Sequence, residues 1–259
     1  MRRIICRVAY DGTAYSGWQE QPTAVTIEGE LNKALQSLTG EEIHVIGASR
    51  TDAGVHALGN ICVFDTDSTI PPERFYKAMN VRLPADIRVV ESGEVAADFH
   101  PRHQRTEKTY CYTIWNGDTE NPLWNRYSMH RYGEMDLDGM ELAGKHLVGT
   151  HDFKAFCSAR TSAETTVRTI YDVTVQRSVE KPELIYIRVT GNGFLYNMVR
   201  IIAGTLVEIG AGLRNRESVL YALREKDRTL AGPTAPAKGL CLEEIRYPDA
   251  FFPTIRAKL

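Results

Sequence analysis

The spacing of apolar and polar residues predicts a regular mixture of strands and helices along the chain. In the first half, apolar-rich runs bounded by turn residues predict strands over residues 2–10, 42–48, 58–66 and 87–95. Leucines and Ile27 recur at helical spacing between residues 26 and 40, where Gly40 ends the run, so this segment is predicted to be a helix. A second helix is predicted from the Pro71-Pro72 pair to about residue 82.

The second half repeats this rhythm. Strands are predicted at residues 109–115, 166–178, 184–190 and 239–247, and helices at 135–149, 194–211 and 217–226. Two halves of this kind indicate an α+β fold of two similar sheet-plus-helix units, as in ferredoxin-like or RRM-like halves. Periodicity lapses near residues 98–106, which places two domains at 1–104 and 105–259. No long linker separates them, so we expect them to pack around a central cleft.

Composition narrows the class of protein. The 259 residues are 43% hydrophobic and 25% charged, which is typical of a globular chain with a real core. A net charge of −2 argues against a surface coated with basic residues, although not against a basic cleft. Five dispersed cysteines without a C-x-x-C pair indicate free, mostly buried thiols in a reducing compartment. No apolar run has the form of a signal peptide or a membrane span, so we expect a cytoplasmic protein.

The stretch SRTDAGVHA, residues 49–57, holds the most informative chemistry. Its glycine and aspartate suit an ordinary turn between two strands, and local chemistry alone favours that interpretation. A metal site lacks ligands, because only His44, Asp52 and His56 are near in sequence. A pair of catalytic carboxylates is excluded, because Asp52 is flanked by Arg50 and not by another acid. An aspartate beside an arginine is expected to have a lowered pKa, which suits an anionic nucleophile or base.

The chain resembles a known family in five blocks that occur in order. These are YDGTAYSGWQ (10–19), RTDAGVHA (50–57), KTYCY (108–112), GFLYNMVR (193–200) and TAPAKGLCL (234–242). They are similar to the signature of the tRNA pseudouridine synthases of the TruA type. The sequence departs from the family pattern at two positions. Ser49 stands where the family most often has glycine, and Pro101, before Arg102, stands where a smaller residue is more usual. The resemblance implies the pseudouridine synthase fold, no cofactor and no metal.

The resemblance also assigns roles to four residues. Asp52 is the essential carboxylate, and three routes stay open: attack on ribose C1′, addition to the base, or removal of the C2′ proton. Tyr110 stacks on the target uracil, although a plain strand tyrosine is the simpler interpretation from its own chemistry. Arg50 fills the space left by the extruded uridine. Arg200 pairs with the carboxylate, whereas its helical position alone predicts a solvated arginine. Gly193 and Gly204 would permit close backbone approach near it.

The expected partner is tRNA, modified at positions 38 to 40 of the anticodon stem-loop, and the resemblance implies a homodimer. A basic run before Tyr110 is the best candidate for phosphate contact: Arg102, His103, Arg105 and Lys108. Arg160 and Arg168 are further basic candidates, whereas Arg214 and Arg216 are expected to be solvated. The role of His56 is open between a turn-stabilising residue and a substrate contact. Two alternative functions are a non-catalytic RNA-binding module, which needs no carboxylate, and a hydrolytic glycosylase, which needs a second one.

Overall fold

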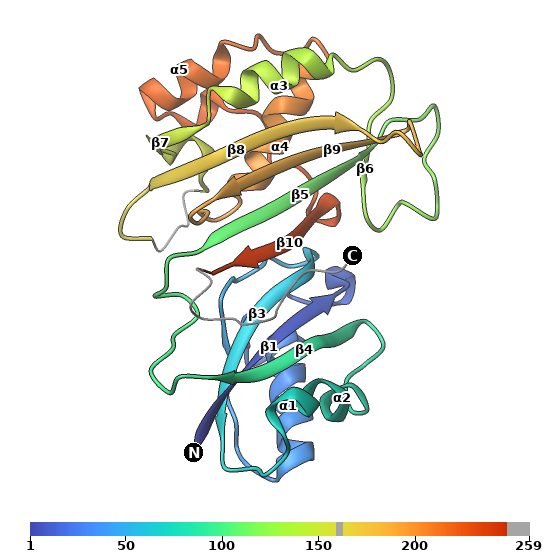
Figure 1. The fold of residues 1–259 in the computed structure, drawn as a ribbon. Helices are drawn as coiled ribbons and strands as arrows, with labels where there is room; N and C mark the ends of the chain where they lie inside the picture. Colours follow the sequence, from blue (N-terminus) through green and yellow to red (C-terminus); the bar gives the residue numbers. More distant parts are fainter. Residues whose placement is uncertain (159–162, 248–259) are drawn as a thin grey trace. The chain divides into compact units, whose positions relative to one another are not determined.

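The computed structural model describes residues 1–158 and 163–247, and the chain divides into two compact units. Of the described residues, the first unit contains Met1–Thr106 and residues 242–247, and the second contains those within Glu107–Cys241. The positions of the units relative to one another are not determined (Figure 1). The sequence predicted a boundary between residues 104 and 105, and the structure divides the chain after Thr106. Residues 242–247 belong to the first unit again.

The first unit is a sheet covered by two helices (Figure 1). Its long strands are β1 (Arg2–Tyr10), β3 (His56–Thr66) and β4 (Ile87–Val95), in the antiparallel order β4-β1-β3. The short strand β2 (Ile46–Gly47) pairs with β3. Helices α1 (Ile27–Thr39) and α2 (Phe75–Asn80) contact each other, and α2 packs on β4. These elements confirm the α+β class predicted for this half.

The boundaries of α1 follow from its caps. The Thr26 hydroxyl accepts a hydrogen bond from the backbone N–H of Gly29 at 3.2 Å, which satisfies one free donor of the first turn. At the other end, Gly40 has a φ of +76°, the left-handed conformation that ends helices. The predicted helix over residues 26–40 is therefore confirmed.

The strand predicted over residues 42–48 is wrong for most of its length. Ile43 and Val45 are buried, so the alternation that suggested a strand is real. The backbone N–H of Val45, however, donates to the side-chain oxygen of Asn32 on α1 at 2.9 Å. Because that amide is bonded to a helix side chain, only Ile46–Gly47 forms a strand.

The second unit is a larger sheet with helices on one side (Figure 1). Strands β5 (Glu107–Trp115), β9 (Leu184–Gly191), β8 (Val167–Arg177) and β7 (Gly149–Asp152) follow one another in antiparallel order. The strands predicted at residues 166–178 and 184–190 are β8 and β9, which pair antiparallel. A two-residue strand, β6 (Met129–His130), runs parallel to β5 and was not predicted. The helices are α3 (Leu137–Lys145), α4 (Met198–Gly210) and α5 (Ser218–Glu225).

The remaining elements are short. Strand β10 (Leu240–Arg246) begins in the second unit and ends in the first. The 3-10 turns are η1 (Gly12–Ala14), η2 (Pro72–Arg74), η3 (Lys154–Phe156), η4 (Arg228–Leu230) and η5 (Ala237–Gly239).

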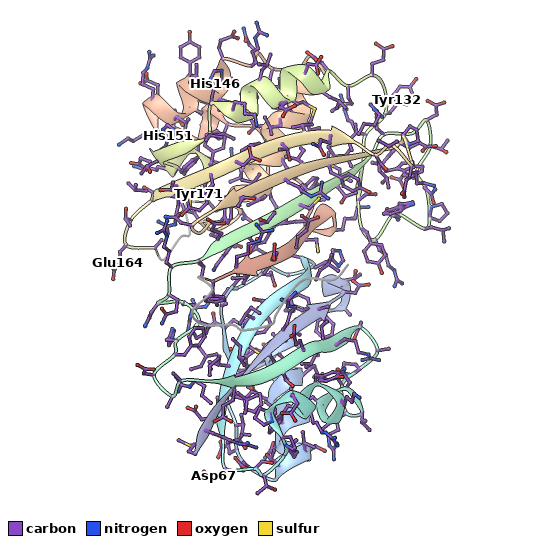
Figure 2. All side chains as sticks on the ribbon, in the orientation of Figure 1. Asp67, Tyr132, His146, His151, Glu164 and Tyr171 are labelled. Carbon is purple, nitrogen blue, oxygen red and sulfur yellow. The ribbon has the colours of Figure 1, made fainter. Side chains whose placement is uncertain are left out.

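All five cysteines are present as thiols, and all except Cys241 are buried, as the sequence predicted. Charged side chains occupy the surface; Asp67, for example, lies 2.7 Å from the N-terminal amine (Figure 2). In the part of the chain that the structure describes, no helix has the length and apolar character needed to cross a membrane.

Candidate active site

Asp52 lies in a tight turn between β2 and β3. Its carbonyl accepts a hydrogen bond from the N–H of Val55 at 3.1 Å, which closes the turn. Gly54 has a φ of +77°, the conformation that a type II turn requires at its third residue. The carboxylate-bearing residue itself is half-buried. The turn predicted from local chemistry is therefore present, and it carries the candidate carboxylate.

The segment containing YDGTAYSGWQ holds this turn through its backbone. Trp18 N–H donates to the carbonyl of Thr51 at 3.0 Å, and Gly54 N–H donates to the carbonyl of Tyr15 at 3.3 Å. Gly17 has a φ of +92°, and a Cβ there would lie 2.7 Å from the Thr51 carbonyl oxygen. Two blocks that are distant in sequence are thus joined around Asp52, and only glycine fits at the contact.

His56 is a buried residue that stabilises the same region. It is 6% exposed, and its Nδ1 lies 3.1 Å from the backbone nitrogen of Gly12 and 3.1 Å from a carboxylate oxygen of Asp11. A neutral ring accepts the Gly12 N–H at Nδ1, whereas a protonated ring donates to Asp11. Burial and these partners support the turn-stabilising role. Arg50, by contrast, is exposed.

Tyr110 lies in the middle of β5 in the second unit. It is 6% exposed and faces Val189 of β9 across the sheet. Its ring meets Phe194 edge to face, with centroids 5.3 Å apart and an interplanar angle of 86°. Such pairs are favoured by the quadrupoles of the two rings, so the tyrosine ring has a fixed orientation.

Arg200 lies in the first turn of α4 and is held by two side-chain bonds. Its Nε donates to the carbonyl of Ala235 at 2.8 Å, and its Nη1 donates to the side-chain oxygen of Asn197 at 2.8 Å. The backbone completes the link, because Ala235 N–H donates to the Arg200 carbonyl at 3.1 Å. The residue is half-buried, so the solvated arginine expected from its helical position is wrong.

The segment before β10 covers α4 and explains this burial. A Cβ at Gly204 would lie 2.0 Å from the Pro233 carbonyl oxygen, which confirms the close approach predicted there. Gly193 does not share this role, because the nearest atom to a Cβ at that position is 4.0 Å away. The same segment meets β5, where the Tyr112 hydroxyl donates to the Pro236 carbonyl at 2.9 Å. The three blocks of the second unit are therefore joined.

Comparison with known proteins decides the family. A family model described as tRNA pseudouridine synthase matches residues 7–104 and 143–248. The chain is 47% identical over 253 residues to tRNA pseudouridine synthase A of Shouchella clausii, covering 97% of this chain and 96% of that protein. It is 46% identical to the protein of the same name from Brevibacillus brevis, over 95% of this chain and all of that one.

The chain belongs to the tRNA pseudouridine synthase family. It is an RNA pseudouridine synthase, an isomerase that converts uridine to pseudouridine in tRNA. The matched segments contain Asp52 and Arg200, whereas Tyr110 lies between them. A chain in a solved Cbf5-Nop10-Gar1 complex aligns over 93% of this chain and 47% of its own length, at 13% identity and a TM-score of 0.33; the family assignment rests on the sequence relatives.

The basic run predicted to contact RNA phosphates is largely exposed to solvent. Arg102, His103 and Arg105 are exposed and belong to the first unit, whereas Lys108 is half-buried and belongs to the second. His103 stacks on His100, with centroids 3.8 Å apart and planes at 15°. Burial and then the neighbouring His103 lower the pKa of His100.

The other basic residues of this synthase differ from one another. Arg168 is half-buried and donates to the carbonyl of Thr165 at 2.9 Å, and burial lowers its pKa. Arg214 is not solvated as predicted: it bonds Glu208 at 2.8 Å and the carbonyl of Leu230 at 2.8 Å. Arg216 is exposed as predicted. Arg160 lies outside the described residues.

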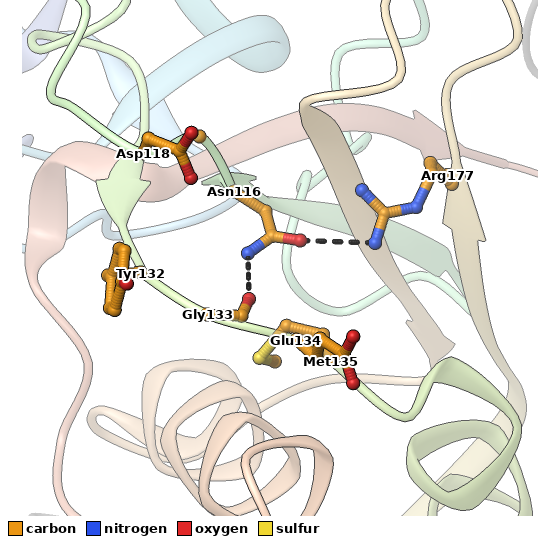
Figure 3. Close-up of a pocket in the computed structure, with 8 residues that line it drawn as sticks. Asn116, Asp118, Tyr132, Gly133, Glu134, Met135 and Arg177 are labelled. Carbon is orange, nitrogen blue, oxygen red and sulfur yellow. Dashed lines mark hydrogen bonds between the residues drawn. The ribbon is translucent and has the colours of Figure 1, made fainter.

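The second unit of the synthase also contains a cavity of about 460 Å³ (Figure 3). Asn116 links two of its walls, because its side chain accepts from Arg177 at 3.1 Å and donates to the carbonyl of Gly133 at 2.8 Å. Tyr132 and Glu134 also line the cavity. None of the residues selected from the sequence lines this cavity.

Asn197 was not among the candidate residues, yet it contacts Arg200. It has a φ of +61°, and its amide nitrogen donates to the Ser158 hydroxyl at 2.8 Å. The available signal was an asparagine directly before a helix, because asparagine tolerates the left-handed conformation better than most residues.

Proposed function

We propose that this synthase acts on uridines at positions 38 to 40 of the tRNA anticodon stem-loop, with Asp52 as its essential carboxylate. The observation that carries the role of Asp52 is its placement in a turn held on both sides by backbone hydrogen bonds. A carboxylate on such a turn has a defined orientation before the substrate arrives, which is what catalysis by positioning requires.

In the reaction, the bond between ribose C1′ and uracil N1 breaks, and a bond between C1′ and C5 forms. The C5 proton leaves and N1 gains a proton, so atoms and electrons balance without a donor or an oxidant. Asp52 assists by attacking C1′, by adding to the base, or by removing the C2′ proton. All three routes use an ionised carboxylate in a site that excludes bulk water.

Three further residues have proposed roles. Tyr110 stacks on the uracil, and its fixed ring supports this because a preset orientation lowers the entropic cost of stacking. Arg200 pairs with the catalytic carboxylate, and its bonds to Ala235 and Asn197 limit the positions its guanidinium can take. Arg50 fills the stack after the uridine leaves it; its exposure supports a role at the RNA surface.

We further propose that residues 1–104 form the domain with the aspartate loop, and residues 105–259 the domain with Tyr110 and Arg200. The exposed run Arg102, His103 and Arg105, together with Lys108 and Arg168, contacts tRNA phosphates. A homodimer would enlarge this basic surface, which suits a chain with a net charge of −2. Its place of action is the cytoplasm.

The proposal is tested with tRNA that carries tritium at uridine C5. Wild type should release tritium and form pseudouridine at positions 38 to 40, with no free uracil. Asp52→Asn, which keeps the shape and removes the charge, should bind the tRNA and do neither. Asp67→Asn, at an exposed acid in the same unit, should behave as wild type.

Each alternative gives a different result. Activity that survives in Asp52→Asn would overturn the role of the carboxylate. Free uracil or an abasic product would indicate a glycosylase. Binding without any release of label by wild type would indicate a binding module. Pseudouridine at other positions would overturn the choice of stem-loop alone.

A further inference from the structure

Burial alternates along the residues that lead to Asp52. Ser49 and Thr51 are 8% and 7% exposed, whereas Arg50 between them is exposed and Asp52 is half-buried. In an extended segment, successive side chains point to opposite sides. The contacts that hold Ser49 and Thr51 in the interior therefore also determine where the side chains of Arg50 and Asp52 point.

Tyr10, at the end of β1, anchors Thr51. The phenol oxygen of Tyr10 lies 2.8 Å from the Thr51 hydroxyl, and both residues are buried. The Tyr10 ring is itself fixed, because it packs on Trp18 with centroids 5.9 Å apart. Trp18 also holds the loop directly, through the hydrogen bond from its backbone N–H to the Thr51 carbonyl.

Asn60, on β3, anchors Ser49. It is 0% exposed, and its amide nitrogen donates to the Ser49 carbonyl at 2.9 Å and to the Tyr10 hydroxyl at 3.2 Å. Its side-chain oxygen accepts the N–H of Ile61 at 2.9 Å, so its donors and acceptor all have partners. A fully satisfied buried network is rigid, because each change of geometry leaves a polar group without a partner.

We propose that Tyr10 and Asn60 are positioning residues for catalysis, which act on Asp52 and Arg50 through Thr51 and Ser49. The proposal rests on the proposed role of Asp52. Its physical basis is that a small displacement of a catalytic group lowers the reaction rate far more than it lowers the affinity for substrate. Supporting residues that fix a reactive group therefore affect turnover more than they affect affinity.

The test removes single hydroxyls without changing shape. Tyr10→Phe and Thr51→Val should each lower kcat for pseudouridine formation by about 10- to 100-fold. KM for tRNA, and tRNA affinity measured by filter binding, should stay within about twofold of wild type. Thr51→Ser restores the hydroxyl and should recover most of the activity. The double variant Tyr10→Phe/Thr51→Val should be no less active than Tyr10→Phe, because that substitution already removes the bond to Thr51 as well as the bond from Asn60.

Thr66→Val is the matched control. Thr66 is also buried, lies at the other end of β3, and uses its hydroxyl to bind the Glu41 carboxylate at 2.9 Å. This variant loses a buried hydroxyl bond in the same unit but should keep wild-type kcat. Thermal unfolding of each variant fixes an assay temperature at which all of them are folded.

The outcomes are distinct. Wild-type kcat in Tyr10→Phe, an equal loss in Thr66→Val, or additive losses in the double variant would each overturn the positioning role. A loss of tRNA affinity equal to the loss of kcat would also overturn it, because it would indicate a binding function. If Asp52→Asn retains activity, the proposed role of Asp52 has failed, and this result does not depend on the Tyr10 variants.

Discussion

The Arg200 guanidinium donates a 2.8 Å hydrogen bond to the side-chain oxygen of Asn197, three residues earlier in the chain. Asn197 is at the same time bonded to the Ser158 hydroxyl and adopts a left-handed backbone conformation. Asn197 directly precedes α4 and Arg200 lies in its first turn, so the short amide is within reach of the guanidinium. The start of α4 therefore holds Arg200, the proposed partner of Asp52.

Replacement of Asn197 should reduce turnover without unfolding the protein. Asn197→Gly keeps the left-handed conformation and removes the acceptor, so kcat should fall by about 10- to 100-fold while tRNA affinity changes little. Asn197→Asp keeps an acceptor and should lie closer to wild type. Lys226→Gly is the control, because Lys226 is also left-handed, with a φ of 56° at the end of α5, and should leave kcat unchanged. Equal losses in the two glycine variants would contradict a specific effect through Arg200.

The strands and helices with strong periodicity could be predicted from the sequence, since their signals are local. The helix over residues 26–40 contains its own caps, β1 is a run rich in apolar residues, and the first four residues of β4 alternate between buried and exposed. The strand predicted over residues 42–48 failed because the backbone N–H of Val45 donates to the side chain of Asn32, a partner that the local pattern does not reveal. Short pairings such as β6 carry too few residues for any periodic signal.

The candidate site shows the same division. Spacing alone placed Asp52 in a turn, and its role came from the resemblance. Burial of Arg200 could not be predicted, because Ala235, which covers it, lies 35 residues further along the chain. Asn60 and Tyr10 likewise meet only through the fold, because they are 50 residues apart.

Gly204→Ala should destabilise the second unit. The added Cβ would lie 2.0 Å from the Pro233 carbonyl oxygen, so α4 and the segment that covers it must separate. Overpacking of this kind typically costs about 1–3 kcal/mol, and here the clash is with backbone, which cannot change rotamer. Gly193→Ala is the matched control, because the atom nearest to its added Cβ would be 4.0 Å away. Urea unfolding should show a lower midpoint for Gly204→Ala alone; equal midpoints would contradict the close contact.

The ion pair between Arg3 and Asp65 should make the stability of the first unit depend on acid pH. The guanidinium bonds both carboxylate oxygens, at 2.8 and 2.6 Å, and the hydrogen bonds from Arg3 lower the pKa of Asp65 below its usual 3.8. Because the folded pKa is depressed, the contribution is present above pH 3.8 and is lost as the pH falls through the lowered value.

The measurement is urea unfolding of wild type and Asp65→Asn across the acid range. The free energy of unfolding of wild type should exceed that of the variant above pH 4, and the two should converge at lower pH. Arg3→Gln should remove the same acid dependence, because it removes the main cause of the pKa shift. Parallel curves for wild type and Asp65→Asn would contradict the assignment.

The basic run and the exposed arginine of the second unit should differ in their effect on tRNA binding. Arg102 and Arg105 are exposed within the run, whereas Arg216 is exposed next to Glu217, which lies 3.3 Å from its Nε. A side chain that contacts phosphate releases counterions on binding, so its loss changes the salt dependence as well as the affinity. Arg102→Ala and Arg105→Ala should each lower affinity and reduce the slope of log K against log salt concentration by about 0.7–0.9. Arg216→Ala should change neither quantity.

A weaker affinity with an unchanged slope in Arg102→Ala and Arg105→Ala would contradict this prediction. It would mean that the two substitutions act on folding or loop structure and not on phosphate contact, and the basic run would lose its proposed role.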